Sequence, residues 1–232
     1  MSGPTVVILA AGLGTRLGRP IPKTLTELAD GRTILGRQVE AVREVWPAGK
    51  LVIVVGFKQD LVMEACPDAL FVYNDSYDRT NTVRSLQRAL EIGPDGAVVW
   101  MNGDVVLDAS VLARIGEAVD AGQTAVCVEP MAVGEEEVKY TLTEAGTIGE
   151  LSKVVKIPIG EAVGVNTVSA SDRDLLLQHL KACADNDYFE RGLETAIAND
   201  GLQVHPVDVG DLLAVEVDFE EDLAEANRRI TS

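Results

Sequence analysis

The first 130 residues alternate short apolar runs with amphipathic stretches, and this alternation limits the possible folds more than any other feature. Apolar runs rich in β-branched residues occupy 6–10, 51–55, 70–73, 97–101 and 124–128, and helix-like segments occupy 33–45, 59–65, 80–92 and 109–121. Strands that alternate with helices are typical of βαβ units around a parallel sheet. Because the runs are uniformly apolar, we expect both faces of each strand to be covered. The pattern predicts an α/β fold with a mostly parallel central sheet flanked by helices.

The rhythm of the chain changes after residue 129. We expect strands at 139–143, 148–157, 162–169, 203–207 and 213–217, and helices at 171–184, 188–199 and 220–229. The last helix is acidic at its start and basic at its end, which matches the helix dipole. No internal repeat or linker is evident. We therefore predict one domain, 1–232, with a first half at 1–130 and a mixed β second half and closing helix at 131–232.

Charge and hydropathy exclude some classes of partner. The net charge of −17 argues against nucleic acid, because phosphate backbones attract basic surfaces. A small anionic substrate stays compatible, since a few basic groups and a divalent cation can reverse the local sign. No apolar run approaches the roughly 20 residues that span a bilayer, so we expect no membrane association. The start of the chain lacks the features of a signal peptide, and we expect a cytoplasmic protein.

A Gly-rich turn follows the first apolar run, with Gly12, Gly14, Arg16 and then Lys23. Small residues at the end of a strand let backbone N–H groups approach phosphates closely. A dinucleotide fingerprint needs a third glycine one residue earlier and a helix that the following prolines prevent, and a Walker loop needs Gly-Lys-Ser/Thr. An ordinary tight turn is the plain alternative. The two cations that flank one strand end favour a loop that grips a triphosphate.

The segment from Leu9 to Arg16, followed by Pro22-Lys23, resembles the opening motif of the sugar-phosphate nucleotidyltransferase superfamily. The resemblance implies a Rossmann-like fold of the nucleotide-diphospho-sugar transferase type, with an NTP in the first half of the chain and its acceptor in the second. It implies that Arg16 binds the β- and γ-phosphates and that Lys23 neutralises charge at the α-phosphate. The remaining nucleotide-binding residues that it implies in this loop are Leu9, Ala10, Ala11, Gly12, Gly14 and Thr15.

Two acidic positions are candidates for a Mg²⁺ site. Asn102-Gly103-Asp104 closes the run at 97–101, where a carboxylate suits a hard cation, although this triplet is also good turn chemistry. Asp218 follows the run at 213–217, where it could instead cap the last helix. Both positions are similar to the superfamily's metal positions. The resemblance implies that Asp104 and Asp218 bind the metal with Glu216 as helper, and we expect Asn102 to contact the nucleotide.

The segment 73–86 is similar to the Thr-Asn-Asn…Ser-Leu segment of small-alcohol-phosphate cytidylyltransferases, which include phosphocholine, inositol-phosphate and aminoethylphosphonate cytidylyltransferases. There the segment borders the pyrimidine and the acceptor phosphate. The resemblance implies that Asn81 and Ser85 contact the nucleotide, since an amide matches the donor and acceptor edge of cytosine. A helix that begins with Thr80 as its N-cap is the plain alternative. Thr82 and Arg84 depart from the family pattern.

The acceptor region of the family resembles the stretch from Lys153 to Gly164. The resemblance implies that Lys153 holds the acceptor phosphate or phosphonate and that Glu161 faces its organic head or a metal. Charged strand residues that only protect an edge are the plain alternative. Aromatic residues make up 4% of the chain, and a choline cage needs several. We therefore favour a phosphonate or a polyol phosphate over phosphocholine.

The predicted reaction is Mg²⁺-dependent transfer of CMP from CTP to a small phosphate or phosphonate acceptor, with release of pyrophosphate. A hexose-1-phosphate nucleotidyltransferase that uses UTP or dTTP is the enzymatic alternative. A non-catalytic nucleotide-sensing module is the alternative from another class, and the presence of Lys23, Asp104 and Asp218 disfavours it. The expected partners are the NTP and the acceptor, and a homodimer is a further hypothesis.

Overall fold

A central sheet organises the computed structural model, which describes residues 3–131, 134 and 137–231. Within these residues the sheet has nine strands, seven of them in the order β10-β6-β9-β4-β1-β2-β3, and β7 and β8 form a hairpin beside β9. The strands are β1 (Thr5–Ala10), β2 (Lys50–Val55), β3 (Leu70–Tyr73), β4 (Val98–Asn102), β6 (Thr124–Pro130), β7 (Lys139–Leu142), β8 (Ile148–Ser152), β9 (Gly160–Val168) and β10 (Val204–Asp208).

The direction of the strands confirms the predicted fold class. β1 pairs in parallel with β2 and β4, β2 with β3, and β6 with β10. β9 runs antiparallel to both β4 and β6 and therefore joins the parallel first half to the second. The sheet is mostly parallel at one side and mixed at the other, as the change of rhythm in the sequence predicts.

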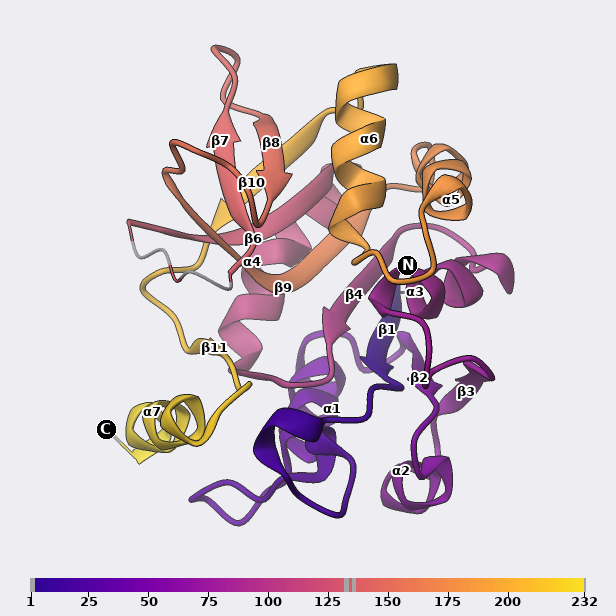
Figure 1. Ribbon diagram of the computed structural model, residues 1–232, viewed down its shortest axis with the longest axis vertical. Helices are drawn as coiled ribbons and strands as arrows, with labels where there is room; N and C mark the ends of the chain where they lie inside the picture. Colours follow the sequence, from indigo (N-terminus) through magenta and orange to yellow (C-terminus); the bar gives the residue numbers. More distant parts are fainter. Residues whose placement is uncertain (1–2, 132–133, 135–136, 232) are drawn as a thin grey trace.

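Helices cover both faces of the sheet (Figure 1). Val7 and Leu9 of β1 pack on the side of α3 (Thr82–Glu91), α5 (Arg173–Ala182) and α6 (Glu190–Asp200). Val6 and Ile8 pack on the side of α1 (Ile34–Val45), α2 (Gln59–Ala65) and α4 (Ala109–Asp120). Successive side chains of a strand point to opposite faces, so a strand with helices on both sides must be apolar at every position. This is the physical reason for the uniform apolar runs.

A second, two-stranded sheet was not foreseen. β5 (Val105–Leu107) begins two residues after β4 and pairs antiparallel with β11 (Ala214–Glu216). α7 (Glu220–Thr231) follows β11, and its Leu223 and Ala226 pack with Leu17, Leu28 and Ile34. This unit fixes the end of the chain against the loop that follows β1, and Figure 1 shows α7 beside that loop.

Two of the boundaries that differ from the expectation lie beside the candidate site. The strand expected at 148–157 ends at Ser152, because Val154 and Ile157 are each 82% exposed and the chain turns there. Lys153 therefore lies in a turn at the end of β8. The helix expected at 80–92 begins at Thr82, with Asn81 as its N-cap. No helix in the described part of the chain has the length and apolar character to cross a membrane.

Candidate active site

A cavity of about 270 Å³ lies at the carboxyl-terminal ends of β1 and β4. This edge of a parallel sheet is where open α/β folds bind ligands. The cavity brings together nearly all the residues that the sequence singles out: Leu9, Ala10, Ala11, Gly12, Gly14, Arg16, Lys23, Asn81, Ser85, Asn102, Asp104, Lys153, Glu216 and Asp218. Thr15 belongs to a short 3-10 turn, and its side chain lies outside the described residues.

Close backbone approaches explain two of the glycines. Gly14 has φ +60°, and a Cβ placed there would lie 2.8 Å from Cβ of Lys23. The N–H of Gly103 donates to the carbonyl of Leu9 at 3.0 Å, and a Cβ on Gly103 would lie 2.7 Å from that oxygen. Only glycine accommodates such contacts without displacing its neighbours. The loop after β1, the segment with Lys23 and the turn after β4 are therefore packed directly on one another.

The two predicted cations meet the two predicted metal carboxylates. Nζ of Lys23 lies 2.5 Å from Oδ2 of Asp104 and 2.6 Å from Oδ1 of Asp218, and Arg16 contacts Oδ2 of Asp218 at 2.5 Å. The pairing of β5 with β11 produces this arrangement, because Glu216 lies opposite Val105 in the ladder. Residues more than 100 positions apart are thereby placed around one ammonium group.

The charges within this cluster shift one another. Burial lowers the pKa of Lys23, but the neighbouring Asp104 and Asp218 outweigh that effect and leave the pKa raised. Burial raises the pKa of Asp218, and hydrogen bonds and charge from Lys23 and Arg16 outweigh it in turn, so this pKa is lowered. Lys23 is thus held as an ammonium and Asp218 as a carboxylate.

Glu216 is partly buried beside the cluster. Its Oε1 lies 3.4 Å from Nδ2 of Asn102. Burial, followed by the charges of Asp104 and Glu137, raises the pKa of Glu216 well above its usual range. A cation bound nearby would offset this repulsion and favour the ionised form.

The carboxylates fit a cation that also binds substrate. Oδ1 of Asp104 is buried and has no hydrogen-bond partner in the described part of the chain, so it has a free ligand position. No group of three or more His, Cys, Asp or Glu among the described residues is arranged as a complete metal cage. Mg²⁺ commonly takes only one or two carboxylates, together with substrate phosphates and water. Asp104 and Asp218, with Glu216 beside them, match that donor set.

The segment from Asn74 to Ser85 is held by its own hydrogen bonds. Oδ1 of Asn81 accepts from the N–H of Thr82 at 2.8 Å, so Asn81, and not Thr80, caps α3. Oγ of Ser85 accepts from Nδ2 of the buried Asn74 at 3.2 Å, and the same amide contacts Oγ1 of Thr80 at 3.2 Å. Both predicted residues line the cavity, but their polar atoms also serve the segment itself. Asn74 was not singled out in the sequence.

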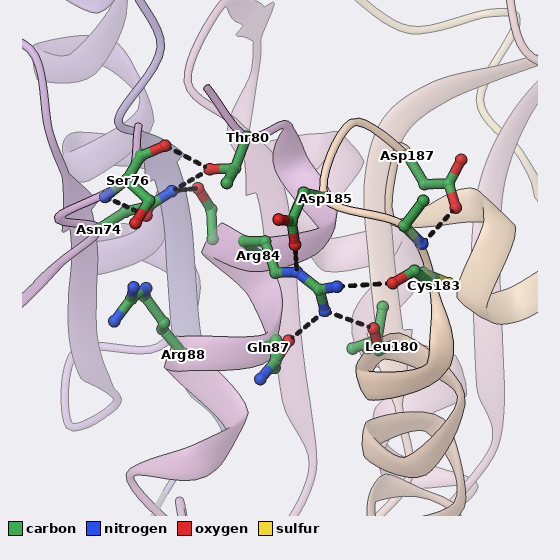
Figure 2. A network of polar contacts seen from close by, with 12 residues as sticks. Asn74, Ser76, Thr80, Arg84, Gln87, Arg88, Leu180, Cys183, Asp185 and Asp187 are labelled. Carbon is green, nitrogen blue, oxygen red and sulfur yellow. Dashed lines mark hydrogen bonds and ion pairs between the residues drawn. The ribbon is translucent and has the colours of Figure 1, made fainter. Parts of the chain in front are cut away.

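Arg84 ties α3 to the segment between α5 and α6. Figure 2 shows its guanidinium between the carboxylate of Asp185 at 2.8 Å, the carbonyl of Cys183 at 2.5 Å and the carbonyl of Leu180 at 3.0 Å. The N–H of Asn81 also donates to the carbonyl of Asp185 at 2.9 Å. These bonds give a structural reason for an arginine at this position.

The second half of the chain contributes Lys153, which the sequence singles out, and further residues that include Glu137, Tyr188 and Glu190. Lys153 lies with its Nζ 4.6 Å from the centroid of the Tyr188 ring, a cation–π contact. Glu137 and Glu190 line the same cavity. Neither glutamate belongs to a recognisable motif, and only the order of the elements in space could have indicated them. Glu161, in contrast, is not among the described residues that line the cavity. Its carboxylate instead accepts a hydrogen bond from the N–H of Gly134 at 3.0 Å.

The sequence matches a family whose name agrees with the fold and with the phosphate-binding character of the cavity. A family model described as the MobA-like NTP transferase domain matches residues 6–155, and the chain belongs to this family.

Known proteins with similar sequences are longer than this chain. The chain is 29% identical over 245 residues to a CMP-5'-(3-aminopropyl)phosphonate synthase of Streptomyces rubellomurinus, which covers 97% of the chain and 38% of that protein. It is 33% identical over 120 residues to the bifunctional protein GlmU of Thiobacillus denitrificans, over 51% of the chain and 26% of that protein. The chain thus spans well under half the length of either relative.

Solved structures share the fold over the whole chain. The CTP:phosphocholine cytidylyltransferase of Streptococcus pneumoniae superposes with a TM-score of 0.74 at 19% identity, over 98% of this chain and 99% of that one. The inositol-1-phosphate CTP transferase of T. maritima superposes with a TM-score of 0.79 at 17% identity, over 100% of this chain and 98% of that one. At such identities the likeness concerns the fold.

Proposed function

We propose that this protein transfers CMP from CTP to a small phosphate or phosphonate acceptor, with Mg²⁺ as cofactor and release of pyrophosphate. The observation that carries the proposal is the cluster in which Lys23 lies between Asp104 and Asp218 at the edge of the Gly-rich loop. This arrangement combines cations for phosphates with carboxylates for a divalent ion. The names of the S. rubellomurinus, S. pneumoniae and T. maritima proteins, which contain CMP or CTP, support cytidine as the base.

In the proposed reaction an oxygen of the acceptor attacks the α-phosphorus, and the bond between that phosphorus and the oxygen that bridges to the β-phosphate breaks. The electron pair leaves with pyrophosphate. Arg16 holds the β- and γ-phosphates, and Lys23 neutralises charge at the α-phosphate. The acceptor is anionic near neutral pH, so no general base is required. When bound to Asp104 and Asp218, Mg²⁺ supplies charge neutralisation and orientation of the phosphates.

Bringing two polyanions together is the main difficulty of this reaction. Positioning and charge neutralisation therefore supply most of the rate enhancement. The lining of the cavity supports this mechanism, because Arg16 and Lys23 lie at the end with the Gly-rich loop and Lys153 comes from the second half of the chain. The nucleotide and the acceptor would thus each meet a cation from a different half of the chain.

The test is a pyrophosphate-release screen. Four NTPs are combined with phosphonates, inositol phosphate, phosphocholine and hexose 1-phosphates, each with Mg²⁺ and with EDTA. We expect release with CTP and a phosphonate or polyol phosphate, and none with EDTA. Release with UTP or dTTP and a hexose 1-phosphate would replace the cytidylyl assignment with the hexose alternative. No release in any combination would contradict the proposed activity.

A further inference from the structure

Glu190 is buried in the cavity wall and has no role in the phosphate chemistry described above. Its side chain lines the cavity, and the residue is 7% exposed. Within the described residues its Oε2 has no hydrogen-bond partner. Buried carboxylate oxygens without a partner are costly and are rare in folded proteins. A group of this kind, aimed into a cavity, indicates a ligand that supplies the missing donor.

Burial also changes the ionisation of this group. Desolvation raises the pKa of Glu190 to about 7, although its own backbone N–H and the charge of Lys153 act in the opposite direction. Glu137 lines the same cavity, and burial raises the pKa of this carboxyl as well. A cationic ligand group would restore the ionised form of both, because an opposite charge within a few ångströms favours ionisation.

The charge of the cavity lining points in the same direction. The described residues of the lining include five carboxylates and three cations, and the full set is Asp104, Glu137, Glu190, Glu216, Asp218, Arg16, Lys23 and Lys153. Asp104 and Asp218 are accounted for by Lys23 and a divalent cation. Neither Lys23 nor that divalent cation accounts for Glu137 and Glu190. A purely anionic acceptor held by Lys153 would be repelled by both of them.

We propose that the cavity end formed by Lys153, Tyr188, Glu137 and Glu190 binds a zwitterionic acceptor, with its phosphate or phosphonate on Lys153 and a protonated amine on Glu190. This proposal rests on the proposed function, since it names the class of acceptor for the same site. Glu190 accepts the N–H donors that its Oε2 lacks in the free protein, and Glu137 adds negative charge. The face of the Tyr188 ring already holds one ammonium group, that of Lys153 at 4.6 Å, and suits a second cation.

A different role for Glu190 would be to hold Lys153 in place. The two charges act on each other, as the pKa of Glu190 shows. In that case the loss of the carboxylate would weaken the binding of every acceptor that Lys153 holds. In the proposed role the loss affects only acceptors that carry an amine. Matched ligands with and without the amine therefore separate the two roles.

The experiment measures binding by isothermal titration calorimetry. The protein is free of CTP, and Mg²⁺ is present in the buffer. The ligands are 2-aminoethylphosphonate and 3-aminopropylphosphonate, and their amine-free counterparts ethylphosphonate and propylphosphonate. We expect one aminoalkylphosphonate to bind the wild-type protein about tenfold to a hundredfold more tightly than its counterpart. Glu190→Gln should remove this preference and should not weaken the binding of the amine-free ligand, because the variant also removes a charge that repels an anion.

Glu194→Gln is the matched control, since Glu194 lies one turn further along α6 and pairs with Arg191 at 2.5 Å. This variant should keep the full preference for the amine. Equal binding of both ligands to the wild-type protein, or no binding of either, would overturn the proposal. An equal loss of affinity for both ligands in Glu190→Gln would mean that Glu190 only holds Lys153 in place. That result would overturn the proposal too.

The proposed function can fail independently. Amine-selective binding without pyrophosphate release from any NTP would contradict nucleotidyl transfer to these acceptors and leave the amine subsite in place. Conversely, Mg²⁺-dependent pyrophosphate release from CTP with amine-free acceptors alone would support the cytidylyl assignment and overturn the amine subsite.

Discussion

The backbone N–H of Val217 donates to the carbonyl of Asp104 at 3.0 Å, which fixes the end of β11 to the turn after β4. Asp218 is the next residue, so this one bond places both carboxylates of the cluster within reach of Lys23. The site therefore depends on the pairing of two three-residue strands. It does not depend on the core sheet alone.

Replacement of Asp104 by alanine should abolish turnover and leave the fold intact. The side chain is the partner of Lys23 and has a free oxygen for a cation, and the loss of one such group commonly costs about 10²–10³ in rate. Pyrophosphate release measures the activity, and circular dichroism and the Tm measure the fold. Asp95→Ala, at a carboxylate that is 96% exposed, should keep wild-type activity. Near-normal turnover in Asp104→Ala would remove the metal assignment.

Gly14→Ala should impair both stability and nucleotide binding. The backbone at Gly14 has φ +60°, which costs an L-residue about 1–2 kcal/mol, and the new methyl group would also contact Lys23 at 2.8 Å. Gly18→Ala is the matched control, because Gly18 has φ +61° and nothing within 4 Å of the added Cβ. Urea unfolding should show a lower free energy of unfolding in both variants. Only Gly14→Ala should raise the KM for the NTP, and an equal rise in both would contradict a contact between this loop and Lys23.

Glu190 should make the stability of the free protein depend on pH. Its pKa rises from the usual 4.5 to about 7 on folding, so the folded state binds the proton more tightly. The associated stability is fully present below pH 4.5 and is lost as the pH rises through about 7. The rise in the pKa on folding corresponds to on the order of 3 kcal/mol in the free energy of unfolding.

Glu190→Gln removes this titration. Relative to the wild-type protein, the variant should therefore gain on the order of 3 kcal/mol in the free energy of unfolding between about pH 4.5 and about pH 8. Urea titrations at these two pH values measure the gain. Glu194→Gln, on the same helix, should show a much smaller change. A difference between wild type and Glu190→Gln that does not vary with pH would contradict the raised pKa.

Arg84→Lys should destabilise the protein by about 1–3 kcal/mol, because an ammonium group cannot reproduce the bonds of the guanidinium to Asp185, Cys183 and Leu180. Arg88→Lys, on the same helix, alters a more exposed arginine that pairs with Asp75, and it should cost about 0–1 kcal/mol. Chemical unfolding of both variants gives the comparison. Equal losses would show that the contacts of Arg84 carry no special weight.

The sequence predicts most of the fold because the central strands are buried on both faces. Uniform apolar runs and the helices between them mark these strands directly, and eight of the nine sheet strands agree with the expected ranges to within about two residues, while the strand at 148–157 is too long. β5 was missed because three residues after a Gly-Asp turn carry no periodic signal. Its pairing with β11 joins positions more than 100 residues apart, which no local pattern can indicate.

The residues of the candidate site also fall into those that the sequence predicts and those that it does not. The Gly-rich loop, Lys23 and Asp104 follow strand ends, where the order of the chain already places them near one another. Asn81, predicted to contact the nucleotide, lines the cavity, and its side chain also caps the first turn of α3. Glu137 and Glu190 reach the cavity from a loop and from the start of α6. Nothing in their sequence neighbourhood marks them, since only the packing of the second half on the first turns them inward.

The segment that joins α5 to α6 is bound to the first turn of α3 at both of its ends. Asn81 donates to the carbonyl of Asp185, and the N–H of Phe189 donates to Oγ1 of Thr82 at 3.1 Å. Tyr188 and Glu190 flank Phe189, so two residues of the proposed acceptor end of the cavity are held by the same hydrogen bonds that fix the first turn of α3. In the proposed function, the choice of acceptor and the choice of nucleotide would therefore depend on the same hydrogen bonds. We expect a variant selected for a different acceptor through this segment to change its choice of nucleotide as well.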